Sequence, residues 1–543
     1  MDVKMMNTGK LNSEKPWWKQ GVIYQIYPRS FKDSNEDGIG DLKGIATQLD
    51  YLAWLEVEAL WLSPIYPSPM ADFGYDIADY KGVHPMFGTM SDLEWLLEKL
   101  HEKNMKLILD LVPNHTSSEH PWFKESKASI NSLKRDWYIW RDPKPGGGPP
   151  NNWLSVFGGS AWQWDEETKQ YYYHAFLKEQ PDLNWRNEEV QAAVFDVMKF
   201  WLDKGVDGFR VDVMWHLIKD SELRDNPANP TYQEIESNYS QLLPVYSTDQ
   251  PEVHEIVKGM RKLLNTYSEK VLIGEIYLPI KQLVAYYGVN QQGAHLPFNF
   301  QLLILPWDAQ KIAVAIDQYE GALPVDGWPN WVLSNHDKPR IASRVGMQQA
   351  KVAAVMLLTL RGTPTIYYGD EIGIYDVPIP FDEIQDPQGL NMPDKNLSRD
   401  PARTPMQWDH SAYAGFSTIK PWLRVDKGYK RQNVKIQKDD PYSMLTLYSK
   451  LIQLRNKEPA LHRGTYVPVF SNQQLIMYKR EAEGCDSFLI ALNLTARPAS
   501  FKQEGETFLT GEVMVATSPD AEGMSIGKEI TLGGDEGLVI RLA

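Results

Sequence analysis

The sequence predicts an α/β fold: a closed (β/α)8 barrel of the TIM type with a subdomain inserted after strand 3 and a C-terminal antiparallel β-sandwich domain. Short β-branched or aromatic runs alternate with longer amphipathic helical patterns, as is typical of successive βα units on a parallel sheet. A long Trp-, Pro- and Gly-rich segment interrupts this alternation after the third run. The last part of the chain changes to short alternating strands separated by Gly and Asp turns.

Eight strands are expected, which is the number that closes such a barrel. They are placed at residues 22–31, 59–65, 106–112, 208–213, 271–276, 296–300, 331–337 and 363–368. Amphipathic helices are expected at residues 42–55, 91–103, 188–204, 251–266 and 443–457. Because parallel neighbours need helical crossovers, a closed barrel is the simplest architecture for this order.

The domain organisation follows from the same pattern. Residues 115–185 are too long for a structureless loop, so we expect a folded subdomain over the barrel mouth. The glycines at 146–148 have no strand before them and no helix after them, which argues against a phosphate-binding loop. The predicted segments are 1–114 and 186–462 for the barrel, 115–185 for the subdomain, 376–426 for a long excursion after strand 8, and 463–543 for the β domain.

Composition and charge exclude several classes of protein. Of 543 residues, 43% are hydrophobic and 23% charged, which is ordinary for a globular protein. The net charge of −15 repels phosphate backbones and anionic lipid, so neither nucleic acid nor a membrane is an expected partner. The first residues lack the apolar run of a secretory signal and no stretch reaches ~18 apolar residues, so we expect neither export by that route nor a membrane span. The single cysteine, Cys485, cannot form an internal disulfide, so we expect a cytoplasmic protein; the oligomeric state is left open.

Polar residues gather at the C-terminal ends of the predicted strands, where barrel enzymes hold their active sites. A single aspartate there is more often a helix cap or turn residue. Several carboxylates and two histidines converging on one rim favour an active site instead. The motifs are DLVPNH, GFRVDV, IGEIY and SNHD, which supply Asp110, Asn114, His115, Arg210, Asp212, Glu275, His336 and Asp337.

The ordered motifs resemble the α-amylase superfamily of glycoside hydrolases, family thirteen. Further blocks, ADFGYDIADY, EQPDLNW, GTPTIYYGDEIG and RDPARTPMQWD, stand in the family's order, so the resemblance covers nearly the whole chain. It implies the barrel, inserted subdomain and C-terminal β-sandwich reached above. Within the superfamily, EQPDLN and the long excursion after strand 8 resemble the exo-acting α-glucosidase and oligo-1,6-glucosidase group more than the amylases.

The resemblance also implies roles for individual residues. Retaining glycoside hydrolysis uses a carboxylate nucleophile and a second carboxyl group roughly 5 to 5.5 Å away. Asp212 matches the nucleophile, Glu275 the acid/base and Asp337 the third carboxylate, which binds sugar hydroxyls. Arg210 alternates onto the face of Asp212 and should keep it ionised. The hydroxyl donors to the bound glucose correspond to His115 and His336.

A second group of residues bears on where the enzyme cuts. By resemblance, Tyr75 lies under the ring of the terminal glucose. Asp76, in GYD, and Arg403, in ARTPMQWD, match a pair that closes the pocket in exo-acting members. Arg399 is near enough in sequence to be the partner instead. Because an open amylase cleft needs passage on both sides, a closed pair predicts exo action.

Val213, directly after the expected nucleophile, bears on linkage preference. In related exo-glucosidases an aliphatic residue here accompanies activity on α-1,6 bonds, whereas Thr accompanies α-1,4 preference. The structural alternative is that Val213 ends a β-strand, where a β-branched residue is favoured whatever the substrate. We expect isomaltose-type bonds to be accepted, together with α-1,4 bonds.

One loop, DSNEDGIGD, places oxygen donors at alternate positions, like the first part of a calcium loop. It is not an EF-hand, because the twelfth position is Gly44 rather than Glu. In the family this loop holds a structural Ca²⁺, sometimes Mg²⁺; the alternative is a solvated acidic turn. No organic cofactor is expected. The expected ligands are the side chains of Asp33, Asn35, Asp37 and Asp41 and the carbonyl of Ile39.

The predicted function is that of a retaining exo-α-glucosidase, which releases glucose from the non-reducing ends of short α-glucosides through a covalent glucosyl-enzyme. The alternative is a glucosyl-transferring or isomerising relative, such as a transglucosidase or a trehalose- or sucrose-isomerising enzyme. Such relatives share the catalytic set and differ in whether water or a sugar attacks. Transporter heavy-chain ectodomains resemble the fold without hydrolysing anything, but the full carboxylate set argues against that class.

Overall fold

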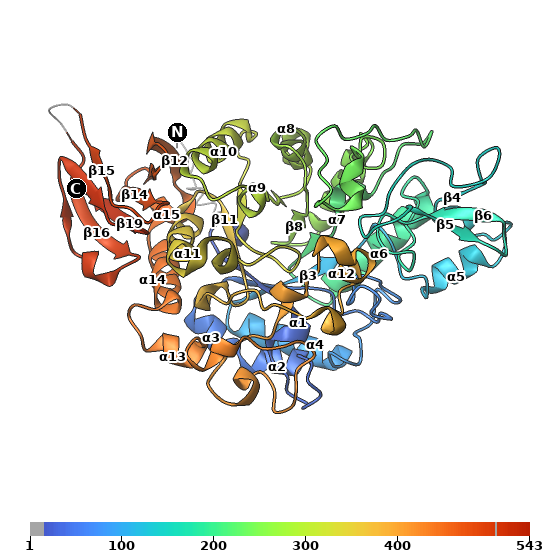
Figure 1. The fold of residues 1–543 in the computed structure, drawn as a ribbon, viewed down its shortest axis with the longest axis horizontal. Coiled ribbons are helices and arrows are strands. Elements are labelled where there is room, and N and C mark those ends of the chain that lie inside the picture. The colour runs from blue at the N-terminus through green and yellow to red at the C-terminus, as the bar shows by residue number, and fades with distance from the viewer. Residues whose placement is uncertain (1–15, 505–507) are drawn as a thin grey trace, which may run out of the picture.

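A computed structural model describes residues 16–504 and 508–543 (Figure 1). Eight parallel strands form one sheet in the order β10-β11-β1-β2-β3-β7-β8-β9, and a parallel bridge between Asn299 and Trp331 joins its two ends. The predicted (β/α)8 barrel is therefore confirmed. Its strands are β1 Ile23–Ile26, β2 Ala59–Leu62, β3 Lys106–Leu111, β7 Gly208–Val211, β8 Val271–Gly274, β9 Leu296–Pro297, β10 Asn330–Val332 and β11 Thr363–Tyr367.

The strands are buried along their length because the barrel interior and the helices cover both faces, as in other parallel sheets. Inside the barrel, large side chains from successive strands, among them Ile23, Trp61 and Ile108, form one apolar cluster. The register between β3 and β7 pairs Asp110 with Arg210. This pairing puts two charged residues side by side at the C-terminal end of the barrel.

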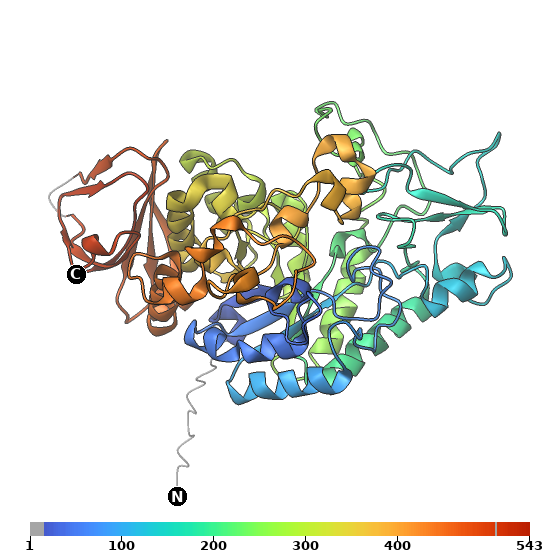
Figure 2. The same ribbon diagram turned by 60° about the horizontal axis from the view of Figure 1, so that its bottom comes forward.

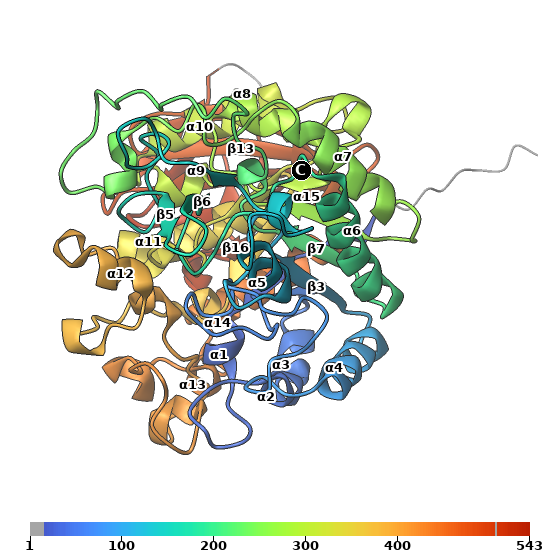
Figure 3. The ribbon, with the colours of Figure 1, turned by 90° about the vertical axis from the view of Figure 1, so that its right-hand side faces the viewer.

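Helices surround the barrel, as Figures 2 and 3 show from two directions. In α7 the buried residues Val253, Ile256, Val257, Met260 and Leu264 recur at helical spacing and face the sheet. The long helices are α4 Met90–Glu102, α6 Glu188–Asp203, α7 Val253–Leu264, α10 Ala309–Ala322, α11 Ile341–Thr359 and α14 Met444–Lys457. The short ones are α1 Pro28–Phe31, α2 Leu42–Thr47, α3 Leu49–Trp54, α5 Pro121–Lys127, α8 Ile280–Leu283, α9 Gln301–Ile304, α12 Pro387–Asn391, α13 Val434–Lys438 and α15 Pro459–Arg463.

All eight predicted strands are shorter in the structure than expected, and three predicted elements differ most. The strand expected at 22–31 ends at Ile26, and Pro28 begins helix α1, because proline has no N–H for a sheet ladder. The helix expected at 42–55 is two helices, α2 and α3, broken at Gln48. The strand expected at 331–337 covers only residues 330–332, so the SNHD motif lies in the loop that follows.

The inserted subdomain contains a three-stranded antiparallel sheet in the order β4-β6-β5. Trp153, Trp162 and Tyr173 form part of its own small core. The subdomain lies at the opposite end of the molecule from the C-terminal domain, with the barrel between them (Figure 1). Its strands are β4 Trp140–Arg141, β5 Trp162–Asp165 and β6 Gln170–Tyr173.

The C-terminal domain is antiparallel, as predicted, with a six-stranded sheet in the order β12-β13-β14-β19-β16-β17 and a two-stranded sheet of β15 and β18. Alternate residues of β13 face different cores: Leu475 and Met477 face the domain's own core, and Ile476 and Tyr478 join the barrel core. The domain therefore packs firmly on the barrel. Its strands are β12 Thr465–Ser471, β13 Leu475–Glu481, β14 Phe488–Asn493, β15 Ala499–Lys502, β16 Gly511–Ala516, β17 Ser525–Ile526, β18 Glu529–Leu532 and β19 Gly537–Leu542.

Among the described residues, the helices are all too short or too polar to cross a lipid bilayer.

Candidate active site

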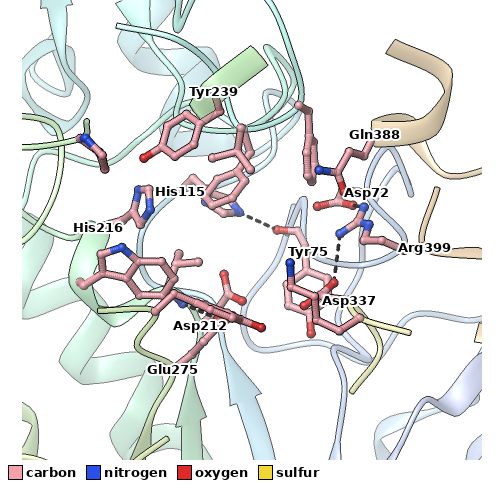
Figure 4. A pocket seen from close by; sticks show the side chains of 18 of the residues that line it. Asp72, Tyr75, His115, Asp212, His216, Tyr239, Glu275, Asp337, Gln388 and Arg399 are labelled. Carbon is pink, nitrogen blue, oxygen red and sulfur yellow. Dashed lines mark hydrogen bonds and ion pairs between the residues drawn. The ribbon is translucent and has the colours of Figure 1, made fainter. Parts of the chain in front are cut away.

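A cavity of about 440 Å³ opens at the C-terminal ends of the barrel strands (Figure 4). The ends of β7 and β8 contribute Asp212 and Glu275, and the loop after β2 contributes Tyr75. The subdomain supplies Phe157 and Phe176, and the excursion after β11 supplies Gln388 and Arg399. The segments that follow the other strands supply further lining residues, which include Asp72, His115, Val213, Trp215, His216, Tyr239, Tyr277, His336 and Asp337.

The buried guanidinium of Arg210 joins three carboxyl groups at the floor of the cavity. Its Nη1 donates to Asp110 Oδ1 at 2.8 Å and to Asp212 Oδ1 at 2.9 Å. Its Nη2 lies 2.7 Å from Glu275 Oε2. The strand register explains the arrangement, because β3, β7 and β8 are neighbours and end at one level. Arg210 thus lies beside Asp212, as expected, and it also contacts the expected acid/base.

Burial raises the pKa of Asp212 well above its ordinary value, against the opposing charge of Arg210 and with a further rise from Glu275. Burial also raises the pKa of Glu275; Arg210 opposes this rise and Asp337 adds to it. Burial also raises the pKa of Asp110, the third carboxyl on this guanidinium, so the three groups titrate together rather than independently. One carboxylate next to one carboxylic acid is the combination that retaining glycoside hydrolysis requires.

Asp337 remains ionised. Burial raises its pKa, but His336, Arg399 and Arg403 together lower it below its usual range. Burial lowers the pKa of His336 to about 3, so this histidine is neutral near pH 7 and the two arginines supply the positive charge. Their guanidinium nitrogens lie 3.3 Å and 3.1 Å from Asp337 Oδ1.

His336 and Tyr75 belong to a directed chain of hydrogen bonds. The side-chain amide nitrogen of Gln25 donates to His336 Nδ1 at 2.8 Å. The proton of the neutral His336 ring is therefore on its other nitrogen, Nε2. His336 Nε2 lies 2.7 Å from the Tyr75 hydroxyl, which donates to Asp110 Oδ2 at 3.1 Å. The His336 and Tyr75 rings are parallel, with centroids 5.4 Å apart.

His115 contacts the backbone of Tyr75, whereas His336 contacts its hydroxyl. Its Nε2 lies 3.2 Å from the backbone carbonyl oxygen of Tyr75, and burial lowers its pKa to about 4. Both expected histidines are therefore neutral near pH 7. They line the cavity as hydrogen-bonding groups rather than as cations.

The predicted pairing of Asp76 with Arg403 is wrong. Asp76 is fully buried and its two carboxylate oxygens accept the backbone N–H groups of Ala71 and Asp72, at 2.9 Å each. The aspartate that pairs with an arginine is Asp72, whose Oδ1 lies 2.6 Å from Arg399 Nη2. The motif ADFGYD holds both aspartates, and only the turn at 71–76 decides that Asp76 faces inward and Asp72 faces the cavity.

Arg399 lines the cavity, whereas Arg403 is buried away from it. Arg399 contacts Asp72, Asp386 and Asp337 and forms one end of the cavity (Figure 4). Arg403 is buried behind it, where its Nε donates to the carbonyl oxygen of His336 at 2.7 Å. Arg399, the alternative partner, thus takes the position expected of Arg403.

Sequence reasoning missed several lining residues of the cavity, among them Phe157 and Phe176 in the subdomain and Tyr239 between β7 and α7. These residues come from irregular segments without a periodic or motif signal.

His216 is also buried in the cavity wall, and its Nδ1 has no hydrogen-bond partner among the described residues. Its ring packs against Phe176 with centroids 5.5 Å apart. Burial lowers its pKa well below the usual value, so it presents a neutral ring nitrogen.

Val213 lines the cavity, but the expectation that it ends a strand is wrong. Strand β7 ends at Val211, and Val213 has φ 36° and ψ 47°, in the left-handed region. A β-branched residue is an outlier in this conformation. Its backbone N–H donates to Glu275 Oε2 at 2.9 Å. Strand propensity therefore does not explain the valine.

The loop expected to hold calcium is closed by its own hydrogen bonds. Asp33 accepts the N–H groups of Asn35, Glu36 and Gly38, and Asp41 accepts those of Ser34 and Gly44. As placed, the carboxylates point at backbone amides, and nowhere in 16–504 or 508–543 do three or more His, Cys, Asp or Glu side chains converge as a ligand set. The donor types are those that calcium prefers. Calcium at Asp33, Asn35, Asp37, Ile39 and Asp41 stays a prediction.

The comparison with known proteins agrees with this geometry. Residues 25–464 match the family described as alpha amylase, catalytic domain. An oligo-1,6-glucosidase of Parageobacillus thermoglucosidasius is 39% identical over 556 residues, covering 96% of this chain and 98% of its own. An alpha-glucosidase of Apis mellifera is 42% identical over 486 residues, covering 87% and 84%.

Solved structures give the same result. An alpha-glucosyl transfer enzyme, XgtA, superposes with a TM-score of 0.92 at 38% identity, covering 98% of this chain and 100% of its own. A trehalulose synthase mutant superposes with a TM-score of 0.89 at 35% identity, covering 97% and 100%. With the carboxyl groups gathered at the barrel rim and a family match over most of its length, the chain belongs to the alpha-amylase family of glycoside hydrolases.

Proposed function

We propose that the protein is a retaining exo-α-glucosidase that releases glucose from the non-reducing ends of short α-glucosides. The observation that carries this proposal is the ion pair between Asp72 and Arg399, which closes one end of the cavity. A polymer cannot pass through a closed end, so only a chain terminus reaches the carboxyl groups. The cavity volume of about 440 Å³ suits a small ligand.

In the proposed mechanism, Asp212 attacks the anomeric carbon and displaces the leaving sugar oxygen, which receives a proton from Glu275. The covalent glucosyl-enzyme is then hydrolysed by water, from which Glu275 takes back a proton. Arg210 orients both carboxyls through its two terminal nitrogens. Asp337, held ionised by Arg399 and Arg403, accepts hydrogen bonds from the sugar and stabilises the developing positive charge.

Isomaltose-type and maltose-type bonds are the proposed substrates. The names of the relatives, oligo-1,6-glucosidase and alpha-glucosidase, support this range. Val213 lies beside the expected cleavage point and lines the cavity, as the linkage argument requires.

Glucosyl transfer or isomerisation is the second candidate, supported by the likeness to an alpha-glucosyl transfer enzyme and a trehalulose synthase. The cavity lining includes the aromatic side chains of Trp215, Tyr239 and Tyr277, and rings of this kind hold sugars well. His216 also lines the cavity, and its Nδ1 has no hydrogen-bond partner in the described part of the chain. An acceptor sugar bound there competes with water for the glucosyl-enzyme.

The deciding experiment incubates the protein with maltose, isomaltose, sucrose and starch, and follows the products by chromatography and proton NMR. Hydrolysis predicts free α-glucose from the disaccharides and nearly unchanged starch viscosity. New disaccharides from sucrose or maltose indicate the transferring or isomerising alternative. Initial release of β-glucose contradicts the retaining mechanism, and rapid fragmentation of starch contradicts exo action.

Calcium binding and a cytoplasmic location are further parts of the proposal, and calcium binding is tested below.

A further inference from the structure

We infer that the left-handed turn at Val213 is a positioning device, which holds the acid/base Glu275 through the backbone N–H of Val213. The inference rests on the proposed function, because it assigns a task to a group around the proposed acid/base. It concerns the backbone of Val213, which is independent of any effect of its side chain on linkage.

Two fixed donors hold one oxygen of Glu275. The N–H of Val213 lies 2.9 Å from Oε2, and Arg210 Nη2 lies 2.7 Å from the same atom. Because Oε2 already accepts the N–H of Val213 and faces the Arg210 guanidinium, the transferable proton belongs on the other oxygen, Oε1. The turn that follows the expected nucleophile therefore orients the carboxyl group on the next strand.

The N–H reaches Glu275 only because Val213 adopts a conformation that valine disfavours. Its φ of 36° lies in the left-handed region, where the β-branched side chain crowds the backbone. Strained backbone of this kind persists where the surroundings over-determine it, and it gathers at functional sites. Both Val213 and its neighbour Met214 are buried, so the surroundings are able to impose it.

Met214 connects the turn to the end of strand β8. A Cβ added at Gly274, the residue before Glu275, would lie 2.7 Å from Met214 Sδ and 3.0 Å from Met214 Cε. Glycine at 274 is therefore what allows the methionine to lie against the strand. Beyond the pairing of β7 with β8, the turn therefore meets the end of β8 at two points, through the N–H of Val213 on Glu275 and through Met214 beside Gly274.

The hydrogen bond has a measurable consequence. A donated N–H stabilises the carboxylate form of Glu275, so losing it raises the pKa of this group. The alkaline limb of kcat/KM, where the acid loses its proton, then moves to higher pH. A misplaced acid also slows substrates with poor leaving groups, such as maltose, more than an aryl glucoside whose leaving group needs no proton.

The test compares Val213→Pro, which removes the N–H and forbids the left-handed φ, with Val213→Gly, which keeps both available. The readouts are the pH profile of kcat/KM on maltose and the ratio of activity on maltose to activity on an aryl α-glucoside. For Val213→Pro we expect the alkaline limb to rise by about one pH unit and the maltose-to-aryl ratio to fall about tenfold. For Val213→Gly we expect the alkaline limb to stay at its wild-type pH.

A second variant acts from the other strand, in case Val213→Pro fails to fold. Gly274→Ala pushes Met214 and the turn away, so the same two changes are expected. Gly321→Ala, in α10, is its control, because a Cβ there meets nothing within 4 Å. A folded Val213→Pro or Gly274→Ala protein with the wild-type limb and ratio overturns the inference, as does a limb that moves equally in Val213→Gly.

The assignment of Glu275 is checked separately, so that its failure is distinguishable. Glu275→Gln should lower kcat/KM on maltose far more than on the aryl glucoside, whose leaving group needs no proton. If Glu275→Gln lowers both equally, Glu275 is not the acid/base and the proposed function fails with the inference. If Glu275→Gln separates the two substrates and Val213→Pro changes neither the alkaline limb on maltose nor the ratio, only the inference about the turn is wrong.

Discussion

Asp72 and Arg399 form an ion pair of 2.6 Å that joins the loop after β2 to the excursion after β11. The two side chains are nearly buried, and they come from segments far apart in the sequence. Arg399 is held in turn by Asp386, which accepts from its Nε at 2.9 Å. The closed end of the cavity is therefore a property of tertiary packing between two irregular segments.

Replacing Asp72 by Asn should weaken catalysis on maltose-sized substrates. Removing one partner of a buried ion pair costs roughly 2 to 5 kcal/mol, so kcat/KM should fall by about thirtyfold or more. Steady-state kinetics on maltose and isomaltose check this. Asp76→Asn is the matched control: Asp76 accepts the backbone N–H groups of Ala71 and Asp72 and a hydrogen bond from Ser68, so its replacement should lower the melting temperature while kcat/KM falls less than in Asp72→Asn. The reverse order would mean that Asp76, not Asp72, serves the substrate.

Asp212→Asn should abolish turnover, because the amide cannot form the covalent intermediate; a loss of roughly 10³-fold or more in kcat is expected. Glu275→Gln should keep part of its activity on an aryl glucoside, and external azide should increase it by attacking the glucosyl-enzyme. Stopped assays with and without azide measure both effects. Equal losses on aryl and sugar leaving groups would show that Glu275 does not donate the proton.

Val213→Thr should shift the ratio of kcat/KM toward maltose over isomaltose. Threonine keeps the shape and the β-branching of valine, so it strains the left-handed turn to the same degree as valine does. Its hydroxyl, however, offers the leaving sugar a hydrogen bond. The shift should stay within about 1 to 3 kcal/mol, the usual effect of one small group in a pocket. Val325→Thr, at a site 88% exposed, is the control. An unchanged ratio would make Val213 a packing residue.

Calcium should raise the melting temperature, and a chelator should lower it, if the loop at 33–41 binds the ion, since binding to the folded state stabilises it by mass action. Calorimetry in excess Ca²⁺, Mg²⁺ or chelator measures the effect. Asp37→Ala should remove the dependence, because this exposed aspartate makes its hydrogen bonds only within the loop. Equal melting curves in calcium and chelator would leave the loop as an acidic turn.

His120 should contribute to loss of stability in acid. Burial lowers its pKa to about 4, below its ordinary value of about 6.5. Between these values the unfolded chain binds a proton that the folded chain does not, so stability falls as pH falls through this window. The full loss is on the order of 3 kcal/mol. His120→Asn keeps an acceptor for the N–H of Trp122 at the start of α5 and cannot titrate. Its melting temperature should therefore fall less between pH 6.5 and 4 than that of the wild type.

The sequence by itself determined the barrel, its order of strands and the residues gathered at its rim. Buried parallel strands and amphipathic helices leave strong periodic signals, and alternation along a strand placed Arg210 and Asp212 on one face without any tertiary information. The family was predicted from the resemblance of its ordered motifs, and the family match over residues 25–464 confirms it.

Only the tertiary structure decided which aspartate closes the cavity, which arginine meets it, and how Val213 turns its N–H to Glu275. Asp72 and Asp76 are the same residue type, four positions apart in an irregular turn, where no period assigns a direction to a side chain. Arg399 and Arg403 differ only through the packing of the excursion on the barrel. A left-handed valine contradicts local preference, so local preference could not predict it; the buried contacts around the turn impose it.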